Sequence, residues 1–140
     1  MTYREKRSDA VQKADQVVRS KGIFNLFKGF HLITTTEQIS QGIECGDFRR
    51  FLLHIFLDST GAPTTIQVKV QFLNETTGKW HTYKQGPFAA LFWEDTDTAS
   101  GVAECFEGPV GGRAMRITLI GVGTSEQAYF TVDASVEFVN

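Results

Sequence analysis

Few residues of this chain have the type and spacing that catalysis or metal binding requires. The three histidines, His31, His54 and His81, are far apart in the sequence and lack the close ligand spacing of a zinc site. His54 falls inside a strong strand pattern, where a histidine is more often a hydrogen-bonded core or interface residue than a metal ligand. No Gly-x-Ser-x-Gly or phosphate-loop motif is present. We therefore predict no catalytic residue, no metal, no cofactor and no enzymatic activity.

The most oxygen-rich segment is residues 94–101, in which Glu94, Asp95 and Asp97 stand among threonines and a serine. Oxygen-rich loops suit calcium. The EF-hand pattern fails, however, because its fifth position would be Ala99. We expect an acidic loop that is either simply solvated or meets a basic partner surface, and calcium binding is the less favoured alternative.

A group of aromatic residues could form a sugar-stacking platform, as in carbohydrate-binding modules. Its members are Trp80, Tyr83, Phe88, Phe92 and Trp93. A domain of this size also needs large side chains to fill its core, and core packing explains most of these residues better. A carbohydrate-binding β-sandwich module is therefore kept as an alternative function.

The two cysteines, Cys45 and Cys105, are too few for a disulfide framework. They could pair once, although most buried cysteines of intracellular proteins behave as small hydrophobic residues. The N-terminus is charged and lacks the apolar stretch of a signal peptide. The longest apolar run, residues 51–57, is interrupted by His54 and is much shorter than the roughly 20 residues of a membrane helix. We expect a protein that is made in a cytoplasm and does not enter a membrane.

The sequence changes character near residue 22. Residues 1–22 carry six basic and three acidic side chains, so their net charge is +3, and Tyr3 is their only aromatic residue. Such a segment buries too little apolar surface to offset the entropy lost on ordering. We therefore predict an N-terminal docking arm, extended or with a short helix over residues 8–20, that lies across another subunit. Its predicted partner-binding residues are Arg4, Lys6, Arg7, Lys13 and Arg19.

An apolar segment, residues 23–30, connects this arm to the rest of the chain. Its aromatic residues could insert into a neighbouring subunit, or they could begin the core of the body. We predict that Ile23, Phe24 and Phe27 anchor the exit of the arm on a partner. Residues 23–140 then form a single domain.

Charge is distributed unevenly along the chain. Residues 93–107 contain five acidic side chains and no lysine or arginine, which gives them a charge of −5. This stretch and the basic arm could match each other between subunits, or they could be two separately solvated faces. On the first interpretation Glu94, Asp95 and Asp97 bind a partner. The formal net charge of −2 argues against a nucleic-acid-binding surface.

The body has the pattern of short strands separated by turn residues. The expected strands cover residues 30–36, 39–45, 48–57, 65–73, 80–84, 102–106, 114–121 and 128–139. In the hairpin formed by residues 65–84, we expect Phe72 to face Trp80. Three alternating runs predict a core that contains Ile66, Val68, Val70, Phe72, Ile117, Leu119, Phe130, Val132 and Val136. The spacing predicts an all-β fold, an antiparallel, jelly-roll-like β-sandwich.

Several runs in the second half of the chain carry a resemblance to a known class of protein. They are DSTGAPTTIQV at residues 58–68, QGPF at 85–88, EDTDTASG at 94–101 and FTVDASVEF at 130–138. With these runs the chain resembles small structural proteins encoded by tailed bacteriophages, over about residues 48–140 and not over the arm. The motifs belong to turns and strands, so no catalytic residue is carried over.

The resemblance implies a virion protein that is assembled in the host cytoplasm. A protein that decorates or cements the capsid is the first expectation, and a neck or tail component is the second. The implied partners are the major capsid protein or neighbouring copies of the chain, in a homo-oligomer such as a trimer. No direct contact with nucleic acid is expected.

Overall fold

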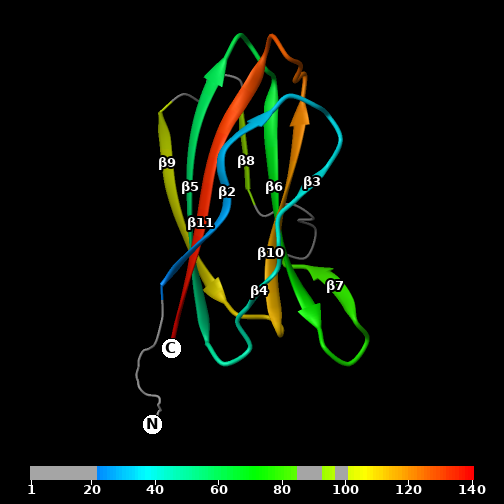
Figure 1. Ribbon diagram of the computed structural model, residues 1–140, viewed down its shortest axis with the longest axis vertical. Helices are drawn as coiled ribbons and strands as arrows, with labels where there is room; N and C mark the ends of the chain where they lie inside the picture. The colour runs from blue at the N-terminus through cyan, green and yellow to red at the C-terminus, as the bar shows by residue number, and fades with distance from the viewer. Residues whose placement is uncertain (1–21, 85–92, 97–100) are drawn as a thin grey trace.

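The computed structural model describes residues 22–84, 93–96 and 101–140 (Figure 1). The predicted arm and its possible helix lie outside the described residues, as do Arg4, Lys6, Arg7, Lys13 and Arg19. Within the described residues there is no helix long and apolar enough to cross a membrane. All regular structure in this part of the chain is β-strand, and the strands pair antiparallel in two sheets.

The first sheet has the order β2-β11-β5-β9, and the second is built around β10 and β6. The strands of the first sheet are β2 (Ile23–Leu32), β11 (Tyr129–Val139), β5 (Arg50–Thr60) and β9 (Val102–Pro109). The second sheet consists of β3 (Gln38–Ile39), β4 (Ile43–Glu44), β10 (Ala114–Val122), β6 (Thr65–Asn74), β7 (Lys79–Thr82) and β8 (Trp93–Thr96). The short strands β3 and β4 both pair with β10, and β7 and β8 both pair with β6.

The connectivity is that of a jelly roll. We count β3 with β4 as one interrupted strand and β7 with β8 as another. The first sheet then contains the first, eighth, third and sixth strands of the chain, and the second sheet contains the second, seventh, fourth and fifth. Two facing sheets that share eight strands in this way form a double-sheet sandwich. The predicted all-β, jelly-roll-like fold is confirmed.

The core lies between the two sheets and matches the sequence prediction. All nine predicted core residues are buried, because they lie on the inner, apolar faces of the strands that carry them. Phe51 and Leu53 of β5 and Met115 of β10 complete the centre of the core.

Three local predictions were wrong, the first of them at the start of the body. The first strand was expected over residues 30–36, whereas β2 covers residues 23–32 and pairs with β11 from Ile23 opposite Glu137 to Leu32 opposite Phe130. The sequence of β2 does not alternate cleanly because the pairing contains two register shifts. At one of them Gly29 has a positive φ of 56°, and its N–H donates to the Asp133 carboxylate over 2.8 Å.

The other two errors lie near β6. Trp80 faces Leu73, not Phe72, because the hairpin closes with Asn74 opposite Lys79, and this places Phe72 opposite His81. A shift of one residue moves a side chain to the other face of the sheet. The stretch expected to be an acidic loop begins as strand β8, because pairing with β6 supplies its backbone hydrogen bonds.

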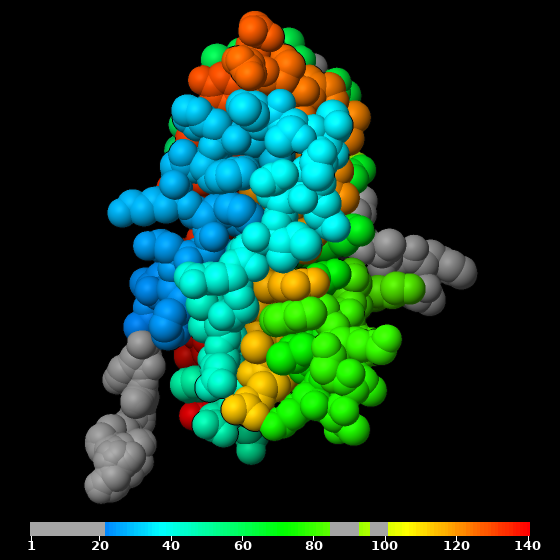
Figure 2. Space-filling view, turned by 45° about the vertical axis from the view of Figure 1, so that its right-hand side comes forward, coloured from blue at the N-terminus to red at the C-terminus, as the bar shows by residue number. Residues whose placement is uncertain are grey.

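The segment between β2 and β5 closes one side of the sandwich. In Figure 2, residues 33–49 run as a cyan band beside β2, and their lower part lies next to the start of β10. The side-chain amide of Gln41 donates to the Asn25 carbonyl over 3.3 Å, and Cys45 N–H donates to the Arg113 carbonyl over 2.8 Å. This segment therefore connects the first sheet to the second at the end of the molecule where β2 begins.

Candidate functional site

A cleft of about 760 Å³ opens at this end of the sandwich. It is lined by residues 44–48 at and after the end of β4, 73–75 at and after the end of β6, and 110–113 between β9 and β10. The first residues of β2 and the C-terminus lie at the same end of the molecule (Figure 1). Three connections and the N-terminal strand thus meet at one place, where a partner could contact all of them.

The walls of the cleft are fixed by backbone contacts between connections. Phe48 N–H donates to the Cys45 carbonyl over 3.0 Å and closes the turn after β4. Arg113 N–H donates to the Leu73 carbonyl over 2.9 Å. Gly112 permits this approach, because a Cβ atom at that position would lie 2.4 Å from the Leu73 oxygen.

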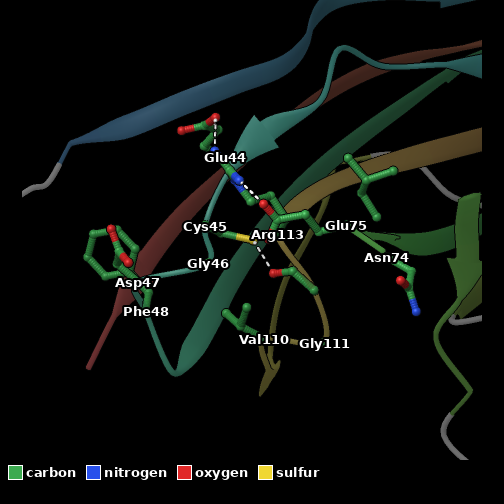
Figure 3. A pocket seen from close by; sticks show the side chains of 12 residues that line it. Glu44, Cys45, Gly46, Asp47, Phe48, Asn74, Glu75, Val110, Gly111 and Arg113 are labelled. Atoms are coloured by element: carbon green, nitrogen blue, oxygen red, sulfur yellow. Dashed lines mark hydrogen bonds and ion pairs between the residues drawn. The ribbon is translucent and has the colours of Figure 1, made fainter. Parts of the chain in front are cut away.

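The charged groups of the cleft are centred on Arg113 (Figure 3). Its Nη2 lies 3.3 Å from Glu44 Oε2, and its Nη1 donates a hydrogen bond to Glu75. The charges of Glu75 and Glu44 raise the pKa of Arg113 above its usual value. Asp47 lines the same cleft, so its lining has three carboxylates and one guanidinium. The cleft is therefore an exposed site with a net charge of −2.

The cysteine in the cleft has a buried thiol. Cys45 is buried, and its Sγ lies 3.6 Å from the Gly112 carbonyl oxygen. Burial, with a smaller contribution from the Glu44 charge, raises the pKa of Cys45 from 9.0 to about 12. The thiolate is the reactive form, so a buried thiol with a raised pKa is less reactive than an exposed one.

The other cysteine lies outside the cleft lining. Cys105 is exposed on β9 and both cysteines are free, so the alternative in which they pair is wrong. The Cys105 Sγ lies 3.6 Å from His54 Nε2 on the outer face of the first sheet, beside a shallow hollow of about 320 Å³. His54 is therefore not a core residue. Among the described residues there is no group of three or more side chains suited to hold a metal ion.

The predicted arm anchors have unequal exposures. Ile23 is 66% exposed and Phe24 is 40% exposed, at the open edge of β2. Phe27 is half-buried, packs against the core, and lies 5.0 Å from Phe30 between ring centroids. Both interpretations of this segment are therefore partly right. Its first residues are free for a partner, whereas Phe27 belongs to the body.

The predicted acidic residues are spread over two sheets. Glu94 on β8 is exposed and accepts a hydrogen bond from Gln67 over 2.9 Å, and Asp95 is half-buried. Asp97 lies outside the described residues. Glu104 and Glu107 stand on β9 in the other sheet, where Glu107 pairs with Arg50. Trp93 and Phe106, with ring centroids 5.4 Å apart, connect β8 to β9 across this side of the sandwich.

The aromatic residues considered as a sugar platform do not share one surface. Phe88 and Phe92 lie outside the described residues. Trp80 lies under the Arg116 guanidinium at 4.2 Å, Tyr83 packs edge-on against Phe51, and Trp93 contacts Phe106. Each of the three described rings thus has a packing partner of its own.

Sequence reasoning missed the cleft residues Glu44, Glu75 and Arg113. They come from three distant segments, and no spacing rule connects them. The glycine pair at residues 111–112 could have indicated the place of the cleft, because paired glycines between strands often permit a close backbone approach.

Comparisons with known proteins do not assign this chain to a family. No protein-family model matches the chain, and no curated protein matches it. Similar solved structures include a chain from Bacillus endospore appendages, which are disulfide-linked pili. It is 13% identical, with a TM-score of 0.38 over 84% of this chain and 80% of that chain. Another is the K3 adhesin domain of Lys-gingipain from Porphyromonas gingivalis, which is 8% identical, with a TM-score of 0.38 over 83% of this chain and 72% of that one. Likenesses this distant carry no argument about function.

Proposed function

We propose that this protein is a non-enzymatic structural protein of a tailed-bacteriophage virion, which decorates or cements the capsid. Its partners are the major capsid protein or neighbouring copies of itself, in a homo-oligomer such as a trimer. The resemblance of residues 58–68, 85–88, 94–101 and 130–138 to small virion proteins supports this class. A neck or tail position is the second candidate, since the same resemblance covers it.

The observation that carries the proposal is the exposure of the arm root. Ile23 and Phe24 are 66% and 40% exposed, and they directly follow a basic segment of net charge +3. Phe138, which lies 6.4 Å from Phe24 between ring centroids, is buried. Exposed apolar residues beside charged ones are typical of a surface that a protein partner covers.

The chemistry of the cleft supports binding over catalysis. The Cys45 thiol stays protonated at neutral pH, and the Arg113 guanidinium is held by two carboxylates. Neither group is set up to attack a substrate or to transfer a proton. An exposed acidic cleft at the end of the sandwich where the arm begins can instead receive a basic segment of another protein.

The arm and its root would act by adding contacts between subunits. Each Å² of apolar surface that they bury is worth roughly 25 cal/mol, before the entropy of ordering the arm is subtracted. A modest site that recurs over a symmetrical shell gains avidity from repetition. A short arm can therefore strengthen the contacts of a shell even when the folded domain that carries it is small.

Deletion of residues 1–22 tests this proposal. The remaining chain should fold, because every described strand begins at Ile23 or later. It should bind capsids that lack this protein at least about tenfold more weakly than the full chain does, as measured by co-sedimentation. Circular dichroism and thermal unfolding provide the control for folding.

The outcomes of this test separate the candidates. Equal binding of the truncated and full chains would refute the docking arm. Binding to purified tails and not to capsids would move the protein to the neck or tail. Binding to neither, with affinity for a polysaccharide instead, would favour a carbohydrate-binding module.

A further inference from the structure

The cleft and the arm have complementary charges. The cleft lining has a net charge of −2, and residues 1–22 have a net charge of +3. Glu44 and Glu75 already hold the guanidinium of Arg113, so carboxylates at this rim can bind an arginine. Asp47 makes no ion pair with any other described residue and is exposed. The cleft can therefore accept further positive charge.

The arm begins close to this cleft. Phe24 lies 6.4 Å from Phe138, and Phe138 lies 6.0 Å from Phe48, between ring centroids. Phe48 lines the cleft. A continuous row of aromatic rings therefore leads from the arm root to the cleft wall. Two copies that meet at this end would bring the arm root of one near the cleft of the other.

The length of the arm allows its basic residues to reach the cleft of a second copy. Arg4, Lys6 and Arg7 form its densest basic cluster. From residue 7 to residue 22 an extended chain spans up to roughly 50 Å, and a helix spans roughly 22 Å. The chain's own cleft wall is only two ring spacings, of 6.4 and 6.0 Å, from Phe24. The cluster can therefore reach the cleft of a neighbouring copy as well as the cleft of its own chain.

We propose that this cleft is the seat for the N-terminal arm of a second copy of the chain, with Arg4, Lys6 and Arg7 of that copy bound by Asp47 and Glu75. Phe48 supplies an apolar wall for the stems of the basic side chains. The inference rests on the proposed function, because it names which of the proposed partners receives the arm. It concerns contacts between copies alone and requires no capsid protein.

Charge reversal of each side tests the proposal in the full chain. The cleft variant carries Asp47→Lys and Glu75→Lys, and the arm variant carries Arg4→Glu, Lys6→Glu and Arg7→Glu. A matched control, Glu37→Lys with Glu126→Lys, makes the same change of charge at two exposed residues outside the cleft. Sedimentation equilibrium measures self-association, and thermal unfolding verifies that each variant folds.

We expect the wild type and the matched control to self-associate. The cleft variant and the arm variant should each associate at least about tenfold more weakly, since charge pairs at interfaces contribute strongly to binding. An equimolar mixture of the two should form complexes again, because the unchanged arm of one can enter the unchanged cleft of the other. Higher salt should weaken all of these complexes.

Three results would overturn the proposal. They are a wild-type chain that stays monomeric, a cleft variant that associates as well as the wild type, and a mixture that forms no complexes. If self-association returns when one chain carries both reversals, but not when the two variants are mixed, the arm occupies the cleft of its own chain. None of these results bears on capsid binding, which the truncation measures separately. Failure of this inference is therefore distinct from failure of the proposed function.

Discussion

The interior of the sandwich and the end that carries the cleft use the same residue type in different ways. Phe51 is fully buried between the sheets and contacts the rings of Phe72 and Tyr83. Phe24 is 40% exposed at the arm root, where it contacts Phe138. The interior is made of long paired strands, whereas the cleft is made mainly of turns, with the two-residue strand β4 and the end of β6. Stability should therefore depend on the interior, and binding on the cleft end.

The largest expected effect comes from truncating one phenylalanine in each region. Phe51→Ala should lower the free energy of unfolding by about 3–5 kcal/mol, because it leaves a cavity between the sheets. Phe24→Ala should lower it by less than about 1 kcal/mol, since much of that ring is exposed. Urea denaturation measures both values. Losses of similar size would contradict the division between the two regions.

A glycine substitution tests how strictly the cleft is built. Gly112→Ala should destabilise the fold by about 1–3 kcal/mol, because its Cβ would lie 2.4 Å from the Leu73 oxygen and the backbone must shift. Gly78→Ala is a suitable comparison. Its φ is +72° and nothing lies within 4 Å of its Cβ, so only backbone strain of about 1 kcal/mol is expected. If Gly112→Ala were as stable as Gly78→Ala, the close approach of Gly112 to the Leu73 carbonyl would not contribute to the stability of the fold.

The buried thiol of the cleft predicts a dependence on pH. The pKa of Cys45 is raised from 9.0 to about 12, so the folded chain keeps a proton that the unfolded chain loses in this window. The free energy of unfolding should therefore fall as the pH rises above 9, by at most about 1.4 kcal/mol per pH unit. Below that window both states are protonated and no dependence arises.

Cys45→Ala isolates this contribution, because the remaining groups titrate alike in both proteins. The slope of stability against pH should be shallower in the variant than in the wild type above pH 9, as measured by urea denaturation. Identical slopes would show that the thiol ionises as readily in the folded chain as in the unfolded one.

The smallest effect is expected at the exposed ion pair of the cleft. Glu75→Gln should change the free energy of unfolding by less than about 1 kcal/mol, because water screens the charges of exposed pairs. A large loss of stability would mean that Arg113 and its partners support the fold. The cleft would then belong to the structural part of the molecule.

The division between the two regions also explains what could be predicted from the sequence. Ile66, Val68 and Val70 alternate with polar residues, and one period-2 run identifies both the strand and its buried face. Trp80 was assigned to the wrong face because one extra loop residue shifts a hairpin register. The cleft was not predictable, since Glu44, Glu75 and Arg113 meet only after both sheets have formed. Local sequence patterns carry no information about contacts between residues that are so distant in the sequence.

The two register shifts in β2 have a consequence for solubility. A straight edge strand with regular spacing is a template on which strands of other copies can stack without limit, as in amyloid. The shifts between Val132 and Ser135, with Gly29 N–H turned toward the Asp133 side chain, interrupt that template in the middle of the edge. Although this chain exposes Ile23 and Phe24, its β2 edge is therefore a less regular template for stacking than a straight strand would be.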